Sequence, residues 1–342
     1  MTRKGSEIGV IGAGSWGTAF ARYLAGIKHL PVTMWAREPE VVESINERHE
    51  NTLYLPDVAL PENLRATASL EEAVGRAELL VIGVPSKFCP SLYPLINSHL
   101  NGDCRYLISL TKGLDEAGTD LLSRLMAKSF PSLGPSRIAV LSGPSFAREL
   151  AKDHPTAVVV ASAEEETAVD LQHSFSSSIL RIYHSTDVVG VELGGALKNI
   201  IAIAAGVVSG MGFGYNTLAS MITRGNIEIL RLGLKLGACE ETFLGLSGIG
   251  DLMLTCFGPL SRNRTFGERI GKGESMEAIL KGSVSVVEGL TTVKTALKLS
   301  EKWGVEMPIT KQIHGVLYEG QDLKVALNEL MGRSLKKEWN VR

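Results

Sequence analysis

The sequence predicts an α/β N-terminal half with a doubly wound parallel sheet, followed by an all-α C-terminal half. Three observations lead to this prediction. Apolar runs of strand length alternate with helical patterns over the first half of the chain, as in a sheet covered by helices on both faces. The first such run leads through a glycine-rich turn into a helix, and beyond Val188 the pattern is helical nearly to the end. We therefore expect two domains, residues 1–187 and 188–342.

The bulk composition is that of a globular chain with a substantial core. Of the 342 residues, 44% are hydrophobic and 21% are charged, and the length suggests two domains of about 150 residues each. The formal net charge of −2 argues against a general nucleic-acid-binding or acidic-membrane surface. The four cysteines form no C-x-x-C pair, so we interpret them as reduced thiols of a cytoplasmic protein.

The glycine-rich turn lies in the strand–turn–helix context that a dinucleotide-binding fingerprint requires. Gly12 lets the chain turn sharply off the strand, Gly14 lets a pyrophosphate approach the backbone, and Gly17 lets the helix pack close to the sheet. The amides of Ser15 and Trp16 begin the helix and face such a ligand along the helix dipole. The turn predicts a Rossmann-type dinucleotide site; the alternative is a glycine-rich turn without a ligand.

The second strand, Pro31–Trp35, ends where NAD-preferring folds place an acidic residue for the ribose 2′-hydroxyl. Here that place holds Ala36 and Arg37. Arg37 has the charge to pair with a 2′-phosphate and a planar face to stack on adenine, so we favour NADPH as the cofactor, with NADH as the alternative. Glu38 is expected to begin the next helix. The competing interpretation of Arg37 is a solvated charge at the end of a strand.

Further buried strands follow, separated by helical segments, of which the first opens with a capping box at Ser69. Ligands of such sheets bind outside the carboxyl ends of the strands. Ser15, Lys112 and the segment Gly143–Ala147 all fall at that edge. The alternatives are a surface lysine for Lys112 and a plain helix N-cap for Ser145. The expected strands are Ala77–Val84, Arg105–Leu110, Arg137–Leu141, Thr156–Ala161 and Leu180–His184.

In the second half, Glu192–Ile203 is predicted to form a helix that is apolar almost all round, and such a helix is buried. Lys198 and Asn199 lie in its middle. A buried lysine is costly unless it has partners or a function, the alternative being a lysine that extends to solvent at a domain edge. The longest apolar stretch, Leu193–Val208, is expected to be too short for a membrane span of about 20 residues.

Two later segments carry polar groups suited to a ligand. Asp251 follows an apolar, glycine-rich segment, where it could orient a catalytic amine or simply favour the first turn of a helix. Ser261 is a good N-cap, and Arg262 and Asn263 stand where they could hold a phosphate or merely form an exposed helix start. The seven histidines lack metal-ligand spacing, so we expect no metal site. The remaining expected helices are Val287–Trp303, Thr310–Glu319 and Leu323–Leu330.

Taken together, the motifs resemble the bacterial glycerol-3-phosphate dehydrogenase family that uses NAD(P), over nearly the whole chain. The resemblance implies reversible reduction of dihydroxyacetone phosphate to sn-glycerol 3-phosphate, as a supply for membrane lipid synthesis. It also implies a homodimer. The motifs are Gly12–Ala19, Ser109–Gly113, Ser142–Ala147, Glu192–Asn199, Leu246–Asp251 and Ser261–Arg264.

The resemblance also implies a role for each matching position. Lys198 would be the catalytic residue. The cofactor would be bound by Gly12, Gly14, Ser15, Trp16, Gly17, Arg37, Lys112, Ala147, Arg262, Val286 and Glu288. The substrate would be bound by Lys112, Gly143, Ser145, Lys198, Asn199, Asp251, Ser261, Arg262 and Asn263.

The chemistry of lysine sets an expectation for the direction of the reaction. A free lysine has a pKa near 10.4, so the neutral amine costs about 4.6 kcal/mol at pH 7, and the available ammonium form favours reduction. Burial and the charges of Lys112 and Arg262 would lower that cost, and Asp251 would oppose them. Two rival functions are a β-hydroxyacid dehydrogenase of the 6-phosphogluconate or hydroxyisobutyrate type and a non-catalytic NADPH-binding regulator. The adjacent Lys198 and Asn199, together with the run Ser261–Asn263, favour the glycerol phosphate interpretation.

Overall fold

The computed structural model describes residues 7–117, 119–281, 286–335 and 337–338. The chain divides into two compact units. The first comprises Met1–Thr111 and Leu122–Val188, and the second comprises Lys112–Leu121 and Val189–Arg342. The second unit therefore takes in a ten-residue segment from the middle of the first half, in addition to the whole C-terminal half.

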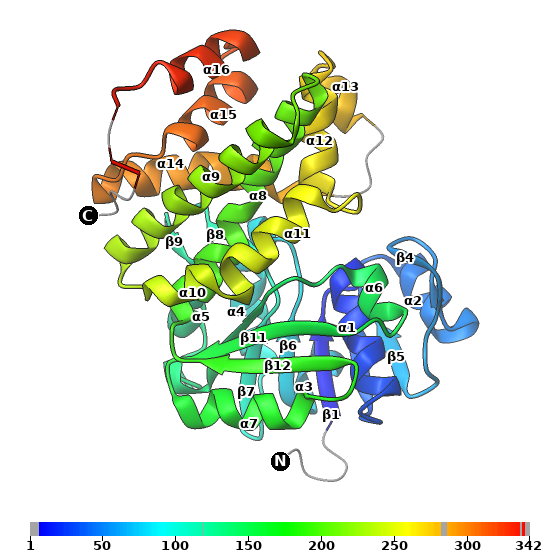
Figure 1. Cartoon of the computed structure of the whole chain (residues 1–342). Coiled ribbons are helices and arrows are strands. Elements are labelled where there is room, and N and C mark those ends of the chain that lie inside the picture. Colours follow the sequence, from blue (N-terminus) through cyan, green and yellow to red (C-terminus); the bar gives the residue numbers. More distant parts are fainter. Residues whose placement is uncertain (1–6, 118, 282–285, 336, 339–342) are drawn as a thin grey trace. The chain divides into compact units, whose positions relative to one another are not determined.

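An eight-stranded sheet organises the first unit, in the order β12-β11-β10-β7-β6-β1-β2-β5 (Figure 1). Strand β1 pairs in parallel with β2 on one side and with β6 on the other, so the strand order reverses at the end of β1. Ligands of doubly wound sheets bind at such a switch point. The strands are β1 (Glu7–Ile11), β2 (Val32–Trp35), β5 (Leu64–Thr67), β6 (Ala77–Ile82), β7 (Tyr106–Ser109), β10 (Ile138–Ser142), β11 (Thr156–Ser162) and β12 (Leu180–Ser185).

Helices cover both faces of this sheet. Adjacent residues of β1 show why: Val10 belongs to one buried apolar cluster with Phe20 of α1, whereas Ile11 belongs to another with Tyr93 of α4, because successive strand side chains alternate between the faces. At the start of α3, Ser69 Oγ accepts a bond from Glu72 N (3.2 Å), which confirms the predicted cap. The elements are α1 (Ser15–Gly26), α2 (Pro39–Arg48), α3 (Leu70–Gly75), α4 (Cys89–His99), α5 (Leu122–Ser129), α6 (Ala147–Ala151) and α7 (Glu165–Phe175), with the short strands β3 (Glu50–Asn51) and β4 (Leu55–Ala59).

Two features of the sheet differ from the expectation. The edge strand β5 was missed, because only four residues of mixed polarity form it and Arg65 faces solvent. The sheet is also not wholly parallel, since β10 and β11 run antiparallel, with Ser142 opposite Val159. The connection between them contains only the five-residue helix α6, too short to carry the chain back across the sheet as a parallel crossover does.

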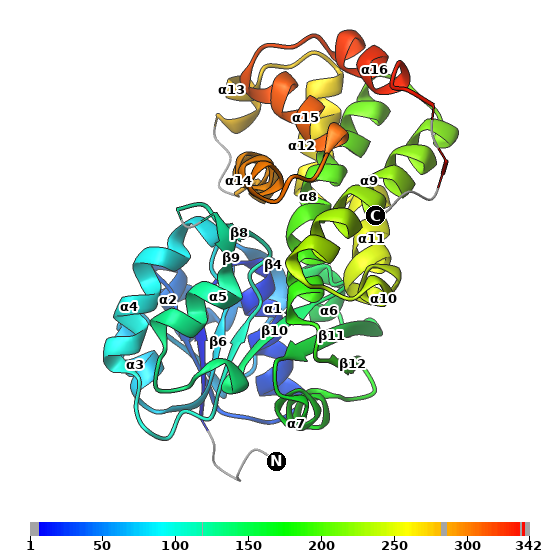
Figure 2. The same cartoon turned by 90° about the vertical axis from the view of Figure 1, so that its left-hand side faces the viewer.

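The second unit is built almost entirely of helices, and Figure 2 shows them from green α8 to red α16. The final helices confirm the predicted ones to within two residues. Its two short strands pair antiparallel and are β8 (Leu114–Asp115) and β9 (Asp120–Leu121). The helices are α8 (Val188–Gly210), α9 (Tyr215–Leu236), α10 (Glu240–Leu244), α11 (Asp251–Phe257), α12 (Arg262–Gly271), α13 (Met276–Leu280), α14 (Glu288–Trp303), α15 (Pro308–Tyr318) and α16 (Leu323–Met331).

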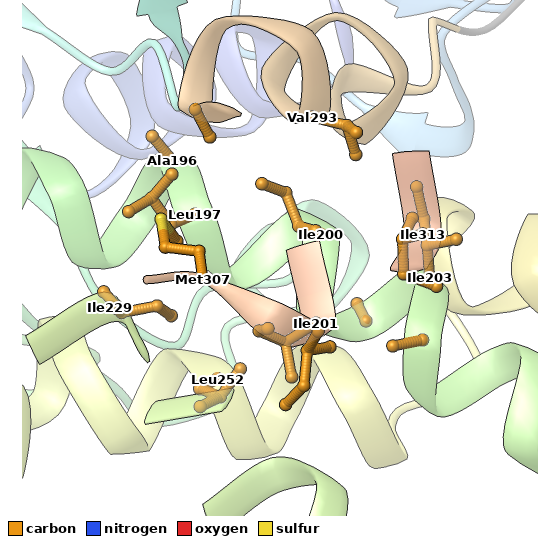
Figure 3. Packing of buried hydrophobic residues seen from close by; sticks show 14 of the residues in the cluster. Ala196, Leu197, Ile200, Ile201, Ile203, Ile229, Leu252, Val293, Met307 and Ile313 are labelled. Carbon is orange, nitrogen blue, oxygen red and sulfur yellow. The ribbon is translucent and has the colours of Figure 1, made fainter. Parts of the chain in front are cut away.

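Helix α8 is the centre of this unit. Its residues Leu197 and Ile201 belong to one buried apolar cluster with Ile229 of α9, Leu252 of α11 and Val293 of α14 (Figure 3). With 23 residues, α8 is longer than the apolar stretch Leu193–Val208, and by length and composition alone the whole helix could cross a membrane. The helix extends beyond that stretch at both ends. However, 89% of its most apolar window is buried inside the structure, which is the behaviour of a core helix.

Helices α8 and α12 approach each other closely at glycines. A Cβ on Gly206 of α8 would lie 2.1 Å from the carbonyl oxygen of Arg264, and a Cβ on Gly267 of α12 would lie 2.1 Å from that of Ile203. Neither position therefore accepts a side chain without moving a backbone. This close crossing packs α12 against the C-terminal half of α8, and Asn263 in the first turn of α12 is hydrogen-bonded to Asn199 of α8.

Candidate functional site

The predicted site residues divide between the two units. In the first unit, the glycine-rich turn between β1 and α1 has the conformation that a dinucleotide site needs. Gly12 has a φ of +110°, and a Cβ there would lie 2.8 Å from Gly83 O. A Cβ on Gly17 would lie 2.2 Å from Gly12 O, whereas a Cβ on Gly14 would meet nothing within 4 Å. Gly12 and Gly17 thus allow close contact between backbone segments, and Gly14 leaves open space beside the backbone.

Helix α1 begins directly after Gly14, and several polar groups lie at its start. Its first-turn amides have no intrahelical acceptor, and no acidic side chain lies in the first turn. The indole Nε1 of Trp16 is buried without a hydrogen-bond partner. Ser15 Oγ donates to Tyr54 O (2.6 Å), which fixes this side chain beside the turn. Open space at Gly14, unpaired amides and a buried orphan donor fit the pyrophosphate of a dinucleotide at the switch point of the sheet.

A pair of alanine substitutions separates the two glycine roles. We expect Gly17→Ala to lower the unfolding free energy by about 1–3 kcal/mol, because its Cβ would overlap a backbone carbonyl. We expect Gly14→Ala to leave stability within about 0.5 kcal/mol but to weaken dinucleotide binding, because its Cβ would enter the open space. Urea unfolding and a nucleotide titration measure the two effects. Equal stability of both variants would contradict the packing role of Gly17.

The other predicted residues of the first unit lie after β2 and β10. Arg37 is exposed, with 68% of its side chain accessible, and pairs with Glu38. Gly143 has a φ of +137°, and Ser145 Oγ donates to its carbonyl oxygen (2.9 Å). Helix α6 begins at Ala147 with Phe146 as its N-cap, so the N-cap interpretation of Ser145 was wrong. The side chain instead closes the local turn. Glu38 is itself the N-cap residue of α2, as expected.

In the second unit, two lysines share one carboxylate. Lys112 Nζ donates to Asp251 Oδ2 (2.7 Å), and Lys198 Nζ donates to Asp251 Oδ1. Lys198 Nζ also donates to Thr255 Oγ1 (2.8 Å), whose own hydroxyl donates to Asp251 O (2.6 Å). Asp251 is fully buried and the Lys198 side chain is 8% exposed. With both lysines protonated, the three side chains carry a net positive charge.

Burial changes the proton affinity of the amine. Desolvation lowers the pKa of Lys198 from 10.5 to about 7; the charge of Asp251 opposes this shift, and that of Lys112 adds to it. At pH 7 the amine is then close to half protonated, and the cost of about 4.6 kcal/mol for the neutral form nearly disappears. The lowered pKa therefore weakens the expected preference for reduction. The amine can give or take a proton near neutral pH.

Amide side chains continue the cluster. Asn199 Nδ2 donates to Lys112 O (3.5 Å), and Asn263 Nδ2 donates to Asn199 Oδ1 (3.0 Å). Asn263 Oδ1 accepts from Gly289 N at the start of α14 (2.9 Å). Ser261 Oγ caps α12 by accepting from Arg264 N (3.2 Å), which confirms its expected role as an N-cap. The structure places the other predicted residues at helix starts: Arg262 at α12, and Val286 and Glu288 at α14.

The contacts of Lys112, Lys198 and Asp251 bear on the alternatives that the sequence left open for these residues. Lys112 is not an isolated surface lysine, since its side chain is 18% exposed and bound to Asp251. Lys198 does not extend to solvent, because its ammonium lies among buried acceptors. Asp251 is both the first residue of α11 and the acceptor of the lysines. Arg262 is exposed at the start of α12, a position that is compatible with either interpretation of this residue. In the described part of the chain, no group of three His, Cys, Asp or Glu side chains could hold a metal ion.

Two members of the cluster, Thr255 and Gly289, were not predicted from the sequence. Thr255 lies four residues after Asp251, and this spacing puts both on one helix face, so the signal was present. Gly289 had no such signal. Its importance comes from contacts across the fold, because a Cβ there would lie 2.7 Å from Asn263 Oδ1.

Comparison with known proteins decides the family. The family model for the NAD-dependent glycerol-3-phosphate dehydrogenase N-terminus matches residues 7–168, and the model for its C-terminus matches residues 187–328. The chain belongs to this family. A glycerol-3-phosphate dehydrogenase [NAD(P)+] of Leptospira biflexa is 46% identical over 97% of this chain and 99% of its own length. One from Geobacter metallireducens is 46% identical over 98% and 99%.

A solved structure of this dehydrogenase family supports the fold. The glycerol-3-phosphate dehydrogenase of Coxiella burnetii superposes with a TM-score of 0.91 at 36% identity, covering 96% of this chain and 99% of its own. Membership in the glycerol-3-phosphate dehydrogenase family agrees with the resemblance stated from the motifs. It covers both units, so the glycine-rich turn and the lysine–aspartate cluster belong to one enzyme family. It also disfavours the β-hydroxyacid dehydrogenases as the nearest relatives.

Proposed function

We propose that the protein reversibly reduces dihydroxyacetone phosphate to sn-glycerol 3-phosphate with NADPH, with NADH as the alternative cofactor. The observation that carries this proposal is the buried cluster in which Lys112 and Lys198 share the carboxylate of Asp251. Such a cluster combines a titratable amine with a surplus positive charge, which suits a keto group next to a phosphate. Family membership supports the same substrate and cofactor.

Lys198 moves the proton in this proposal. When bound, the nicotinamide supplies the hydride that reaches C2 of the substrate. During reduction, the Lys198 ammonium donates its proton to the oxygen on C2 as negative charge develops there. During oxidation, the neutral amine takes that proton back. Asp251 and Thr255 hold the amine in one orientation through their hydrogen bonds. The positive charge of Lys112 stabilises the oxyanion.

The remaining assignments follow the family resemblance and are part of the proposal. Gly12, Gly14 and Gly17, together with the other cofactor-binding positions, hold the dinucleotide. Asn199 and Asn263 orient the substrate through their amides, and a guanidinium with a helix N-terminus suits its phosphate. The further cofactor positions are Ser15, Trp16, Arg37, Lys112, Ala147, Arg262, Val286 and Glu288. The further substrate positions are Lys112, Gly143, Ser145, Lys198, Asp251, Ser261 and Arg262.

The cellular setting is proposed on the same basis. We place the enzyme in the cytoplasm as a homodimer that supplies glycerol phosphate for membrane lipid synthesis. The four cysteines are free thiols, and three of them are buried, in agreement with a reducing compartment. Size-exclusion chromatography with light scattering tests the dimer.

One assay tests the function directly. Purified protein is mixed with dihydroxyacetone phosphate, and the absorbance of NADPH and of NADH is followed in separate reactions. We expect turnover with both, faster with NADPH, and glycerol 3-phosphate as the product. Turnover only with 6-phosphogluconate or hydroxyisobutyrate and the oxidised cofactor would favour the rival enzymes. NADPH binding with no turnover on any of these substrates would favour a regulator.

The pH dependence should differ between the two directions. Because reduction uses the Lys198 ammonium, its kcat/KM should fall about tenfold per pH unit above a pKa of about 7. Oxidation uses the neutral amine, so its kcat/KM should rise through the same pKa and level off above it. Initial rates from pH 6 to pH 9 in both directions measure this. Profiles of the same shape in both directions would contradict a single amine that gives and takes the proton.

A further inference from the structure

The end of β2 holds a carboxylate that the proposed site does not use. Arg37 donates from Nη2 (2.8 Å) and Nε (3.2 Å) to the same oxygen, Oε1, of Glu38. The Arg37 side chain is 68% exposed, but that of Glu38 is only 21% exposed. The carboxylate therefore lies beneath the guanidinium rather than in open solvent. Although Glu38 is the N-cap residue of α2, its side chain makes no capping hydrogen bond, so helix capping does not explain the carboxylate.

A chain of hydrogen bonds ties this carboxylate to the glycine-rich turn. The hydroxyl of Tyr54 donates to the same oxygen of Glu38 (3.4 Å), while Tyr54 O accepts from Ser15 Oγ (2.6 Å). Tyr54 N donates to Asn51 Oδ1 (3.0 Å), and Asn51 Nδ2 donates to Ala13 O (2.8 Å). All of these residues lie in the first unit. Glu38 is thus held at a set position relative to the backbone that would cradle the pyrophosphate.

Position and chemistry together give Glu38 a role in recognising the ribose. In doubly wound folds, the end of the second strand meets the 2′ position of the adenosine ribose. A carboxylate accepts a hydrogen bond from a 2′-hydroxyl, but it repels a 2′-phosphate and competes with it for the guanidinium of Arg37. We propose that Glu38 is a specificity-determining residue that restrains the preference for NADPH and keeps NADH as a usable cofactor. This proposal rests on the proposed function only in taking the ligand to be a nicotinamide dinucleotide.

Binding of cofactor fragments tests the proposal without turnover. Adenosine 2′,5′-bisphosphate and adenosine 5′-monophosphate differ at the 2′ position, and their Kd values can be measured by calorimetry on wild type and Glu38→Gln. We expect the bisphosphate to bind the variant about two- to fivefold more tightly, the size of one partly exposed charge interaction. The monophosphate should bind it several-fold more weakly. Intact NADPH and NADH should change in the same directions.

Two further variants test whether the change in the Kd ratio is specific to Glu38. Glu40→Gln removes an exposed carboxylate two residues away and should change both Kd values less than twofold. Arg37→Gln should weaken the bisphosphate by about tenfold or more, in the opposite sense to Glu38→Gln. An unchanged ratio of the two Kd values in Glu38→Gln, or the same ratio change in Glu40→Gln, would overturn the role of Glu38 and leave the proposed function standing. Failure of wild type to bind either intact cofactor would overturn both.

Discussion

Replacing Lys198 by methionine should reduce turnover in both directions by about a thousandfold, the typical contribution of a general acid or base. Methionine keeps much of the length and apolar volume of the lysine stem, so the packing of α8 is retained. The variant removes the only proton carrier that the proposal places at the oxygen on C2. Steady-state rates with dihydroxyacetone phosphate and with glycerol 3-phosphate measure the loss. NADPH binding should remain within a few-fold of wild type.

The control for this variant is Lys298→Met, which removes an exposed lysine on α14. It should retain full activity, because a solvated lysine has no part in the proposed chemistry. Thermal unfolding of both variants shows that each is folded. Turnover of Lys198→Met within about tenfold of wild type would remove this residue from the catalytic role.

Replacing Asp251 by asparagine should give the largest loss of stability at the site. Asp251 is fully buried and accepts from Lys112 and Lys198, so its loss leaves the Lys112 ammonium and the Lys198 amine without their shared carboxylate. Breaking a buried pair in this way costs about 3–5 kcal/mol. Urea unfolding at pH 7 measures the change. The pKa of Lys198 should also fall, since Asp251 raises it, and the reduction profile should shift to lower pH.

A double variant identifies the cause of that loss. Lys198→Met combined with Asp251→Asn removes a buried ammonium together with its partner, so it should be less destabilised than the sum of the two single variants. Simple additivity of the two effects would contradict a direct interaction between Lys198 and Asp251. A wild-type pH profile in Asp251→Asn would contradict its influence on the amine.

Most of the first unit could be predicted from local patterns. The turn at Gly12, the parallel strands and the cap at Ser69 depend on neighbouring residues, and the structure has them where the sequence indicated. The antiparallel pairing of β10 with β11 could not be predicted in this way, since it depends on how the connection through α6 crosses the sheet. Local sequence patterns also do not predict that Lys112–Leu121 belongs to the second unit. This membership depends on Leu114 and Leu121, which are buried in the apolar core around α8.

The chemistry of the site was only partly visible in the sequence. A lysine in an apolar helix signals a partner, but the partner of Lys198 lies 53 residues away, and no local spacing connects the two. The shared carboxylate and the lowered pKa of the amine follow from burial, which a sequence pattern does not measure. Glu38 shows the opposite case. Its position suggested a helix start, and the structure shows a second set of contacts through its side chain.

The most direct test of the central claim is a titration of the Lys198 amine itself. Protein labelled with ¹⁵N in its lysines is titrated by NMR, and Lys198→Met assigns the signal by its loss. The account predicts a midpoint near pH 7, far below that of exposed lysines, and a rise of the midpoint when glycerol 3-phosphate binds. An amine that remains protonated up to about pH 10 and does not respond to glycerol 3-phosphate would contradict it.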